Sequence, residues 1–495
     1  LVFMVVQFMG LFYFLASGKT VTILPGDPKQ VTMKDYYGQE SLKKTLSQWL
    51  QLLQDPSQLK AMGGEAVRGI LLSGEPGVGK SWLAKCIAGE IDIPFIGTDG
   101  SSFTSMFMGI GVIKVIRLWA KARSLARRFK SCILFIDEID ALGARGGMSG
   151  GFGIAGGGMM GGGGLGTLNR ILVEMDGMDE ITRMMQAENK ARRLLLLKPL
   201  SPKDFLVLVI GSTNRPEALD RAMLRPGRFD KKIHVDKPTK ADREAVFLGY
   251  LGKVANSLSS SDVEALVAFT GGMTPADISQ AIKTDACRFA IFDRRDKINR
   301  QDIENGLLEQ QIGLENPIAD WAEDQKYAVA CHEAGHAIAQ HLLMAHRERI
   351  AVTTIKRRGG TLGFMLPVDI EPTYAAPMED IAKEIVVFMS GYYGAKVATG
   401  KPWTGAFGDN RSIQARIWAY YQQSGFGIPL AQTPNQLGGA MKKRIDGWTL
   451  ELAEQTEQLC EANKGAIVRV AKALVERGTL SGDEVVALIQ QETTK

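Results

Sequence analysis

ILLSGEPGVGKS, residues 70–81, joins a short apolar run to a glycine-rich loop, and a helical pattern begins at Trp82. Its last eight residues match the phosphate-binding loop pattern G-x-x-x-x-G-K-[ST] in full. A strand before the loop and a helix after it are the context that this loop requires. The stretch therefore predicts a nucleotide-binding sheet flanked by helices.

Each type of residue in this loop has a distinct use. Glycines let backbone N–H groups wrap phosphate oxygens. Lys80 would place a positive charge on the β- and γ-phosphates, and Ser81 would offer its hydroxyl to Mg²⁺. The predicted ATP-binding residues are Gly74, Glu75, Pro76, Gly77, Val78, Gly79, Lys80 and Ser81.

Two further apolar runs extend the predicted sheet. Residues 133–136 are Ile-Leu-Phe-Ile and precede Asp137 and Glu138, and a third run spans 205–210. Such runs, separated by helical patterns, indicate a parallel sheet with crossover helices. Asp137 at a strand end would hold Mg²⁺. Glu138 would orient and deprotonate the attacking water.

Polar and basic residues follow the third run. Asn214 is placed to position the same water near the γ-phosphate. Arg225 and Arg228 flank a Pro-Gly turn, and guanidinium groups suit phosphate binding. In a ring of subunits they would act as arginine fingers on a neighbour's nucleotide. The alternative is that both arginines only cap a helix.

A second motif, Cys331-His332-Glu333-Ala334-Gly335-His336, lies in a stretch predicted to be helical from Asp320 to Leu343. Two histidines four residues apart share one helix face and can bind one Zn²⁺. Glu333 would be the general base for the attacking water. The five-residue pattern also arises by chance. A helical glycine such as Gly335 costs about 1 kcal/mol relative to alanine, which suggests close approach by another segment.

A zinc site of this kind needs a third protein ligand. The residue pattern alone does not choose among the downstream carboxylates. They are Asp369, Glu371, Glu379, Asp380, Glu384 and Asp409. His341 and His346 are expected to be solvated or packed.

Length and composition set broad limits. The 495 residues exceed one ordinary core, so several domains are expected. A net charge of +5 without a dense basic run gives no support for nucleic-acid binding. The five cysteines form no C-x-x-C pair, which argues against a cysteine zinc site and favours a reducing compartment.

The N-terminal run is apolar and carries no charge over residues 1–16. A membrane span needs about 20 such residues. We expect residues 1–18 to be the C-terminal part of a transmembrane helix cut within a longer span. A signal-peptide core and a buried helix are the alternatives. Lys19 weakly favours the cytoplasmic side for the residues that follow.

The rest of the chain divides by pattern. Residues 19–34 are expected to be a linker, 35–238 the nucleotide-binding subdomain, 239–311 a helical lid and 312–495 a mainly helical domain with a β segment at 350–366. Residues 143–166 hold 14 glycines and predict a flexible loop. Residues 179–204 are expected to be a surface insertion.

Together these motifs resemble the FtsH family of membrane-anchored AAA+ proteases. The shared order comprises residues 35–38, the 74–81 loop, ILFIDEID at 133–140, residues 168–177 and STNRPEALDRAMLRPGRFD at 212–230. By resemblance, Phe107 in Phe-Met-Gly is the pore-loop aromatic that grips a threaded polypeptide. Thr404 to Asp409 resembles the family's T-G-A-x-x-D, which makes Asp409 the third zinc ligand. Residues 271–278 resemble the lid motif, with modest departures from Met273 to Pro275.

The resemblance implies a fold of an α/β AAA+ module with a helical lid, followed by a mainly α zinc metalloprotease domain. It implies an ATP-dependent zinc endopeptidase that unfolds, translocates and degrades membrane or soluble proteins. Its cofactors would be one Zn²⁺ per subunit, ATP and Mg²⁺. Its partners would be polypeptide substrates, a membrane and five further subunits of a homo- or hetero-hexamer. Both domains would lie on the cytoplasmic, stromal or matrix side.

One segment departs from the family pattern. Residues 390–396 are Ser-Gly-Tyr-Tyr-Gly-Ala-Lys, where the family has Gly-Gly-Arg-Ala-Ala-Glu-Glu. Ala395 and Lys396 thus replace an acidic pair near the metal helix. Losing carboxylates that orient metal-bound histidines costs about 10- to 100-fold. The alternative function is therefore an unfoldase or translocation motor with a weak or inactive protease domain. A membrane-assembly scaffold with neither activity fits the ATPase residues poorly.

Overall fold

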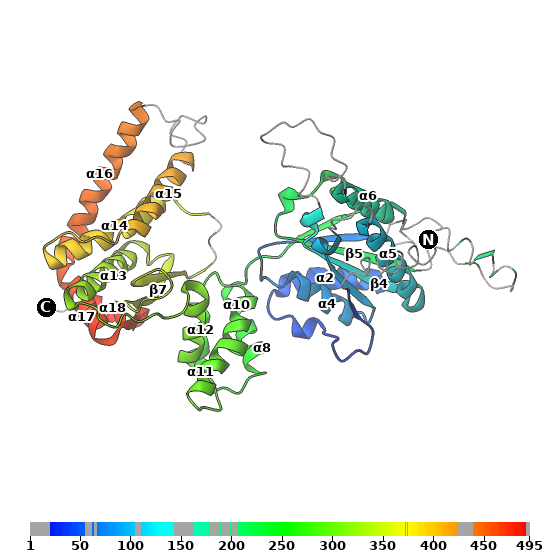
Figure 1. The fold of residues 1–495 in the computed structure, drawn as a ribbon, viewed down its shortest axis with the longest axis horizontal. Coiled ribbons are helices and arrows are strands. Elements are labelled where there is room, and N and C mark those ends of the chain that lie inside the picture. The colour runs from blue at the N-terminus through cyan, green and yellow to red at the C-terminus, as the bar shows by residue number, and fades with distance from the viewer. Residues whose placement is uncertain are drawn as a thin grey trace, which may run out of the picture. The chain divides into compact units, whose positions relative to one another are not determined.

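A computed structural model of the chain describes residues 20–54, 62–63, 67–103, 110–142, 163–177, 186, 189–190, 192, 194, 199, 205–371, 373, 375–423 and 439–491 (Figure 1). It comprises two compact units. The first holds Leu1–Pro238 with Thr274–Ala276, and the second holds Thr239–Met273 with Asp277–Lys495. The first division follows Pro238, where the nucleotide-binding subdomain is expected to end.

The first unit is built on a six-stranded sheet. The strands are β1 (Val21–Ile23), β2 (Gly69–Ser73), β3 (Phe95–Asp99), β4 (Ser131–Asp137), β5 (Leu206–Thr213) and β6 (Lys231–His234). Their order is β1-β3-β4-β5-β2-β6, and every neighbouring pair except β1 with β3 is parallel. The parallel sheet predicted from the apolar runs is confirmed.

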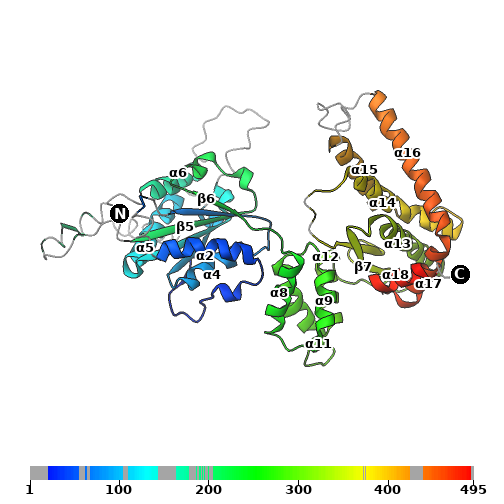
Figure 2. The ribbon, with the colours of Figure 1, turned by 180° about the vertical axis from the view of Figure 1, so that it is seen from behind.

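Helices cover both faces of this sheet. They are α2 (Glu40–Gln54), α4 (Lys80–Glu90), α5 (Ile110–Phe129) and α6 (Gly163–Asp176) (Figures 1 and 2). Successive strand residues point to opposite faces. Leu71 accordingly joins the core beside Trp119 of α5, whereas Ile70 and Leu72 join the core beside Leu83 of α4. This two-sided burial explains the continuous apolar runs.

Three strands have weak sequence signals. β1 lies within residues 19–34, which are expected to be a linker, and forms the antiparallel edge of the sheet. β3 (FIGTD) and β6 (KKIH) mix apolar with polar residues. β1 and β6 are the edges of the sheet, and an edge strand needs one apolar face at most, so neither shows an apolar run. β3 lies between β1 and β4, and its buried residues include Gly97 and Thr98, which interrupt the apolar run.

The second unit begins with five lid helices. They are α8 (Lys240–Leu251), α9 (Ser260–Phe269), α10 (Pro275–Gln280), α11 (Cys287–Phe292) and α12 (Arg300–Ile312), and α10 starts on residues of the first unit. Thr239, Ser259 and Asn299 begin α8, α9 and α12 with capping boxes. Each cap satisfies backbone N–H groups that the first helical turn leaves free. Residues 239–311 form helices joined by short turns, with an isolated β-bridge between Asn256 and Ile298.

The remainder of the second unit packs six helices around a small sheet. The helices are α13 (Glu323–Met344), α14 (Met378–Thr399), α15 (Phe407–Gln423), α16 (Gly439–Ala462), α17 (Lys464–Arg477) and α18 (Gly482–Gln490). The sheet order is β8-β7-β9, with β7 at Glu348–Thr354, β8 at Phe364–Asp369 and β9 at Thr479–Ser481. Figure 2 shows α18 beside β7. Because β8 stands at the end of the sheet and pairs only with β7, its other edge is free within this sheet.

Helices α13 and α14 cross at two glycines. A Cβ atom on Gly335 would lie 2.2 Å from the carbonyl oxygen of Ser390, and one on Gly394 would lie 2.9 Å from the Cα atom of Gly335. Any side chain here would separate the helices. The close approach expected from the unfavourable helical Gly335 is confirmed.

Among the described residues, no helix is both long and apolar enough to cross a bilayer. Residues 1–18, expected to end a transmembrane helix, lie outside the described residues, as do Phe107 and most of 143–166 and 179–204.

Candidate nucleotide and metal sites

The phosphate-binding loop joins β2 to the first turn of α4. Gly74, Gly77 and Gly79 have φ values of 149°, 81° and 95°, a region that side chains disfavour. Gly79 is the residue before α4 begins. Backbone N–H groups at a helix N-terminus attract anions, so the loop is shaped for phosphate.

Lys80 lies buried between the loop and the end of β5. Its Nζ donates to the carbonyl oxygens of Gly74 (2.9 Å) and Glu75 (2.7 Å) and to Oδ1 of Asn214 (2.6 Å). Burial lowers the pKa of its ammonium group. The fold thus brings Lys80 and Asn214 together from positions 134 residues apart.

Asp137 ends β4 between two serine hydroxyls. Ser81 Oγ donates to its Oδ2 (2.6 Å), and Ser212 Oγ donates to its Oδ1. Ser212 carries no role in the sequence interpretation, although it stands two residues before Asn214. A serine at the end of a buried strand beside the Asp137 strand is the signal that could have found it. Ser81 and Asp137 lie where they could share one Mg²⁺.

Glu138 follows Asp137 with a left-handed backbone, φ 47°. A Cβ atom on Gly100 would lie 2.5 Å from the Glu138 carbonyl oxygen. This turn ends the strand and places Glu138 directly after Asp137. Residues in this conformation are uncommon and often functional.

The two arginines predicted as fingers differ in their surroundings. Arg228 binds Asp176 through Nε–Oδ1 (2.8 Å) and Nη2–Oδ2 (2.7 Å). This pairing raises the pKa of Arg228 and lowers that of Asp176. Arg225 is exposed. Both flank the turn at Gly227, where φ is 86°.

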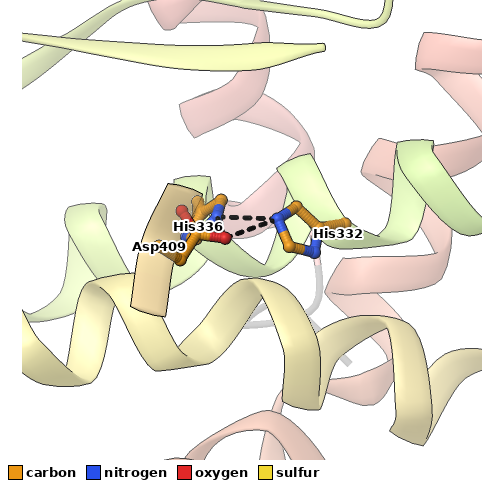
Figure 3. Close-up of side chains that lie close together, drawn as sticks. All are labelled: His332, His336 and Asp409. Atoms are coloured by element: carbon orange, nitrogen blue, oxygen red, sulfur yellow. Dashed lines mark hydrogen bonds and ion pairs between the residues drawn. The ribbon is translucent and has the colours of Figure 1, made fainter. Parts of the chain in front are cut away.

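Three side chains from two helices meet at the second motif (Figure 3). His332 and His336 lie on α13, and Asp409 lies in the first turn of α15. The two Nε2 atoms are 3.1 Å apart, and Asp409 Oδ2 lies 3.0 Å from His332 Nε2 and 3.6 Å from His336 Nε2. Among the described residues this is the one group of His, Cys, Asp or Glu side chains placed to hold a metal ion.

The donor set fits zinc. Zinc bonds to imidazole nitrogen and carboxylate oxygen are about 2.0–2.2 Å, so donors around a tetrahedral ion stand about 3.3 Å apart. The three separations bracket this value. Two imidazoles with one carboxylate form a known catalytic zinc ligand set, which leaves a fourth position open.

His336 is oriented by a backbone carbonyl. Its Nδ1 lies 2.7 Å from the Val387 oxygen, which can only accept, so Nδ1 donates and Nε2 keeps its lone pair. Burial acts to lower the pKa of His336, but Asp409 and Glu333 outweigh it and the pKa is raised. The pKa of Asp409 is lowered, because the two histidines outweigh its burial.

Glu333 lies beside the candidate metal ligands and beneath the hairpin leading into β8. It is 5% exposed, and burial raises the pKa of its carboxyl group. The Met365 N–H donates to it, and a Cβ atom on Gly363 would lie 3.0 Å from its Cγ. A buried carboxylate with a raised pKa suits a general base.

The divergent segment 390–396 lies within α14. A Cβ atom on Gly391 would lie 2.4 Å from His336 Nε2 and 2.7 Å from His332 Cε1. Ala395 is buried, and Lys396 pairs with Glu457 at 2.6 Å. Neither side chain can supply a carboxylate to the histidines. His336 obtains its orientation from Val387 instead.

The candidate metal ligands and Glu333 open into one cleft of about 1100 Å³. Residues of α13 and α14 form part of its wall, and β8 with residues 360–363 forms another part. Its aromatic lining comprises Trp321, Phe364, Phe388, Tyr392, Trp403 and Phe407. The free edge of β8 thus borders the same space as the metal site.

Known proteins resemble the chain over both halves. Residues 70–237 match the family described as ATPase family associated with various cellular activities (AAA), and residues 320–428 match Peptidase family M41. A relative from Sorangium cellulosum, ATP-dependent zinc metalloprotease FtsH 2, is 31% identical over 92% of this chain and 74% of its own. ATP-dependent zinc metalloprotease FtsH from Thermus thermophilus is 32% identical over 94% and 72%.

Proposed function

Because this chain belongs to the FtsH family of ATP-dependent zinc metalloproteases, we propose that ATP hydrolysis in its first unit delivers polypeptides to a zinc peptidase site in its second. The chain is an enzyme with zinc, ATP and Mg²⁺ as cofactors. The observation that carries the proposal is the convergence of His332, His336 and Asp409 beside the buried Glu333.

The ATPase residues have separate tasks in this proposal. Residues 74–81 wrap the phosphates, and Lys80 exchanges its present carbonyl partners for phosphate oxygens. Ser81 and Asp137 hold Mg²⁺. Glu138 takes the proton of the attacking water, and Asn214 orients that water. Arg225 and Arg228 reach a neighbouring subunit's nucleotide, and for Arg228 this requires release from Asp176.

The peptidase residues act around the metal. His332, His336 and Asp409 hold zinc, which when bound polarises the peptide carbonyl and lowers the pKa of water to about 7. Glu333 takes the proton from the attacking water and passes it to the leaving amine. The Met365 N–H keeps the Glu333 carboxylate in place. The side chains around Glu333 leave it 5% exposed, which limits water to the cleft side.

The substrate backbone has a place to bind. Strand β8 pairs with β7 along one edge only, and its other edge borders the cleft. An extended peptide can add to such an edge through main-chain hydrogen bonds, which select for extended chain and not for sequence. This binding mode requires an unfolded substrate, and in the proposed function the ATPase unfolds and delivers it.

The ring assembly, the pore loop and the membrane anchor are inferred from the sequence. A hexameric ring would let Arg225 and Arg228 serve the next subunit, and Phe107 would grip the threaded chain. The apolar run at residues 1–18 would anchor the protein in a membrane, with both domains on its cytoplasmic, stromal or matrix side.

A motor with a weak peptidase is the second candidate, favoured by the buried Ala395 and by Lys396, which pairs with Glu457. Casein degradation by the assembled enzyme with ATP and Zn²⁺ separates the two. We expect wild type to degrade casein and Glu333→Gln to leave it intact while still hydrolysing ATP. Intact casein with wild type, alongside continued ATP hydrolysis, would favour the motor.

A further inference from the structure

A cluster of five charged side chains lines the peptidase cleft beyond the metal ligands. This charged cluster consists of Arg347, Glu348, Asp369, Glu384 and Arg416. They come from α14, α15, β7, β8 and the turn after α13. The peptidase chemistry proposed above uses none of them.

The charged cluster lines the same cleft as the metal site. Arg416 follows Asp409 by seven residues on α15, which places it two turns away on the same helix face, about 10 Å along the axis. Glu384 precedes Val387 by three residues on α14, and Val387 orients His336. A peptide lying across the zinc site would therefore pass the charged cluster.

Half of the carboxylate oxygens in the charged cluster accept a hydrogen bond from a described residue. Oε1 of Glu384 accepts from Arg347 Nη1 (3.5 Å), and its Oε2 accepts from Arg416 Nε. Oε2 of Glu348 accepts from Gln340 Nε2 (2.8 Å). Asp369, 39% exposed, is 3.9 Å from Arg347 Nε, beyond hydrogen-bond reach.

The guanidinium groups also have N–H donors that no carboxylate of the cluster accepts. Each arginine carries five N–H bonds. Arg347 Nε is buried and has no hydrogen-bond partner within the described residues, and its distance to Glu348 Oε1 is 3.7 Å. Arg416 is 41% exposed and lies over the Phe388 ring at 5.6 Å. Arg416 thus exposes a guanidinium group at the cleft, and a substrate carboxylate would offer it two oxygens in the planar geometry that arginine matches.

We propose that the charged cluster binds an acidic side chain of the substrate, with Arg416 and Arg347 as its specificity-determining residues; this rests on the peptidase function proposed above. An extended peptide advances about 3.3 Å per residue, so the acidic residue would lie about three positions from the cleaved bond. A lysine drawn to Asp369 is the competing outcome.

Quenched fluorescent peptides test this on the full assembled enzyme with zinc. The peptides are single-substitution variants of one neutral parent. Each carries Glu, Gln or Lys at one of the four positions on either side of the cleaved bond. We expect one position at which Glu exceeds Gln in kcat/KM by roughly tenfold, as for a charge-assisted hydrogen bond. Arg416→Glu should invert this preference towards Lys, which loss of packing alone would not do. Arg411→Gln, an exposed arginine on the same helix outside the cleft lining, should keep it.

Binding separates this proposal from the peptidase proposal. Fluorescence anisotropy of the same peptides on Glu333→Gln should show the Glu peptide binding more tightly than the Gln peptide, whether or not wild type cleaves. Cleavage of no peptide by wild type would contradict the peptidase function alone. The subsite is overturned by equal binding of Glu and Gln peptides, by preference for Lys in wild type, or by a Glu preference that survives Arg416→Glu.

Discussion

Gly391 lies against His336, and a Cβ atom on this glycine would come within 2.4 Å of the Nε2 atom that faces the metal position. The neighbouring ring of His332 would be 2.7 Å away. Helix α14 therefore contributes an open space to the metal site as well as the Val387 carbonyl that orients His336.

Gly391→Ala should displace both imidazoles and weaken zinc binding by roughly 100-fold, the upper range for changes that misorient a ligand. Competition with a fluorescent zinc chelator measures the affinity. Gly447→Ala on α16, where a Cβ atom meets nothing within 4 Å, is the matched control. Unchanged zinc affinity in Gly391→Ala would show that the imidazoles can move aside without cost.

Gly335→Ala should separate α13 from α14, because its Cβ atom would lie 2.2 Å from the Ser390 oxygen. Overpacking of this kind costs about 1–3 kcal/mol. Denaturant unfolding followed by circular dichroism gives the free energy of unfolding. At an open helical site alanine stabilises relative to glycine, so the opposite signs for Gly335→Ala and Gly447→Ala distinguish crowding from helix propensity.

Asp409→Ala should lower the zinc content below one ion per chain and abolish peptide hydrolysis, because two imidazoles alone bind zinc weakly. Metal analysis after dialysis measures the content. In parallel, 1,10-phenanthroline should stop peptide hydrolysis, whereas its non-chelating 1,7 isomer should not. Full zinc occupancy in Asp409→Ala would remove this residue from the ligand set.

Glu138→Gln should bind ATP but hydrolyse it at least about 100-fold more slowly, since the amide cannot take a proton from water. A fluorescent ATP analogue reports binding, and phosphate release reports turnover. Glu217→Gln, an exposed carboxylate of the same unit, serves as control. Normal turnover in Glu138→Gln would contradict its assignment as the base.

Asp380 should contribute to the free energy of unfolding in a pH-dependent way. Its buried carboxylate accepts from Lys383 Nζ (3.1 Å) and His346 Nε2 (3.4 Å), and these contacts outweigh burial and lower its pKa. A lowered folded-state pKa stabilises above the unfolded-state pKa, and the contribution disappears as pH falls through the folded-state pKa.

Asp380→Asn should therefore reduce the free energy of unfolding by about 1–3 kcal/mol at pH 7, and the difference from wild type should shrink in acid. Urea titrations at pH 7 and at pH 3 measure both values. Asp446→Asn, an exposed position on α16, is the control. A difference that stays constant with pH would show that the charge of Asp380 contributes nothing.

The sequence is most informative where local pattern and chemistry coincide. The strand before Gly74, the strand ending at Asp137 and the helix carrying His332 and His336 all form as predicted. Each is a buried element with a strong period or a continuous apolar run. Asp409 required the family resemblance, because its partners lie more than 70 residues away and six carboxylates were equivalent by pattern.

Other features depend on tertiary contacts that no local pattern records. Val387 orients His336 through a backbone oxygen, which any residue would offer. Ser212 gains its role from the pairing of β4 with β5. β1 forms because three residues find an edge of the sheet, although Pro and Gly surround them. Such roles emerge only when the neighbouring element is known.

The crossing of α13 and α14 also has a genetic consequence. Every single-base change that alters the amino acid at a glycine codon introduces a Cβ atom or stops the chain. Gly335, Gly391 and Gly394 each have a neighbour within 3 Å of that atom. A screen for lost proteolysis should thus recover these three codons about as readily as those of His332, His336 and Asp409. Six codons, and not only the three that encode the ligands, are therefore sites at which one amino-acid change should inactivate the metal centre.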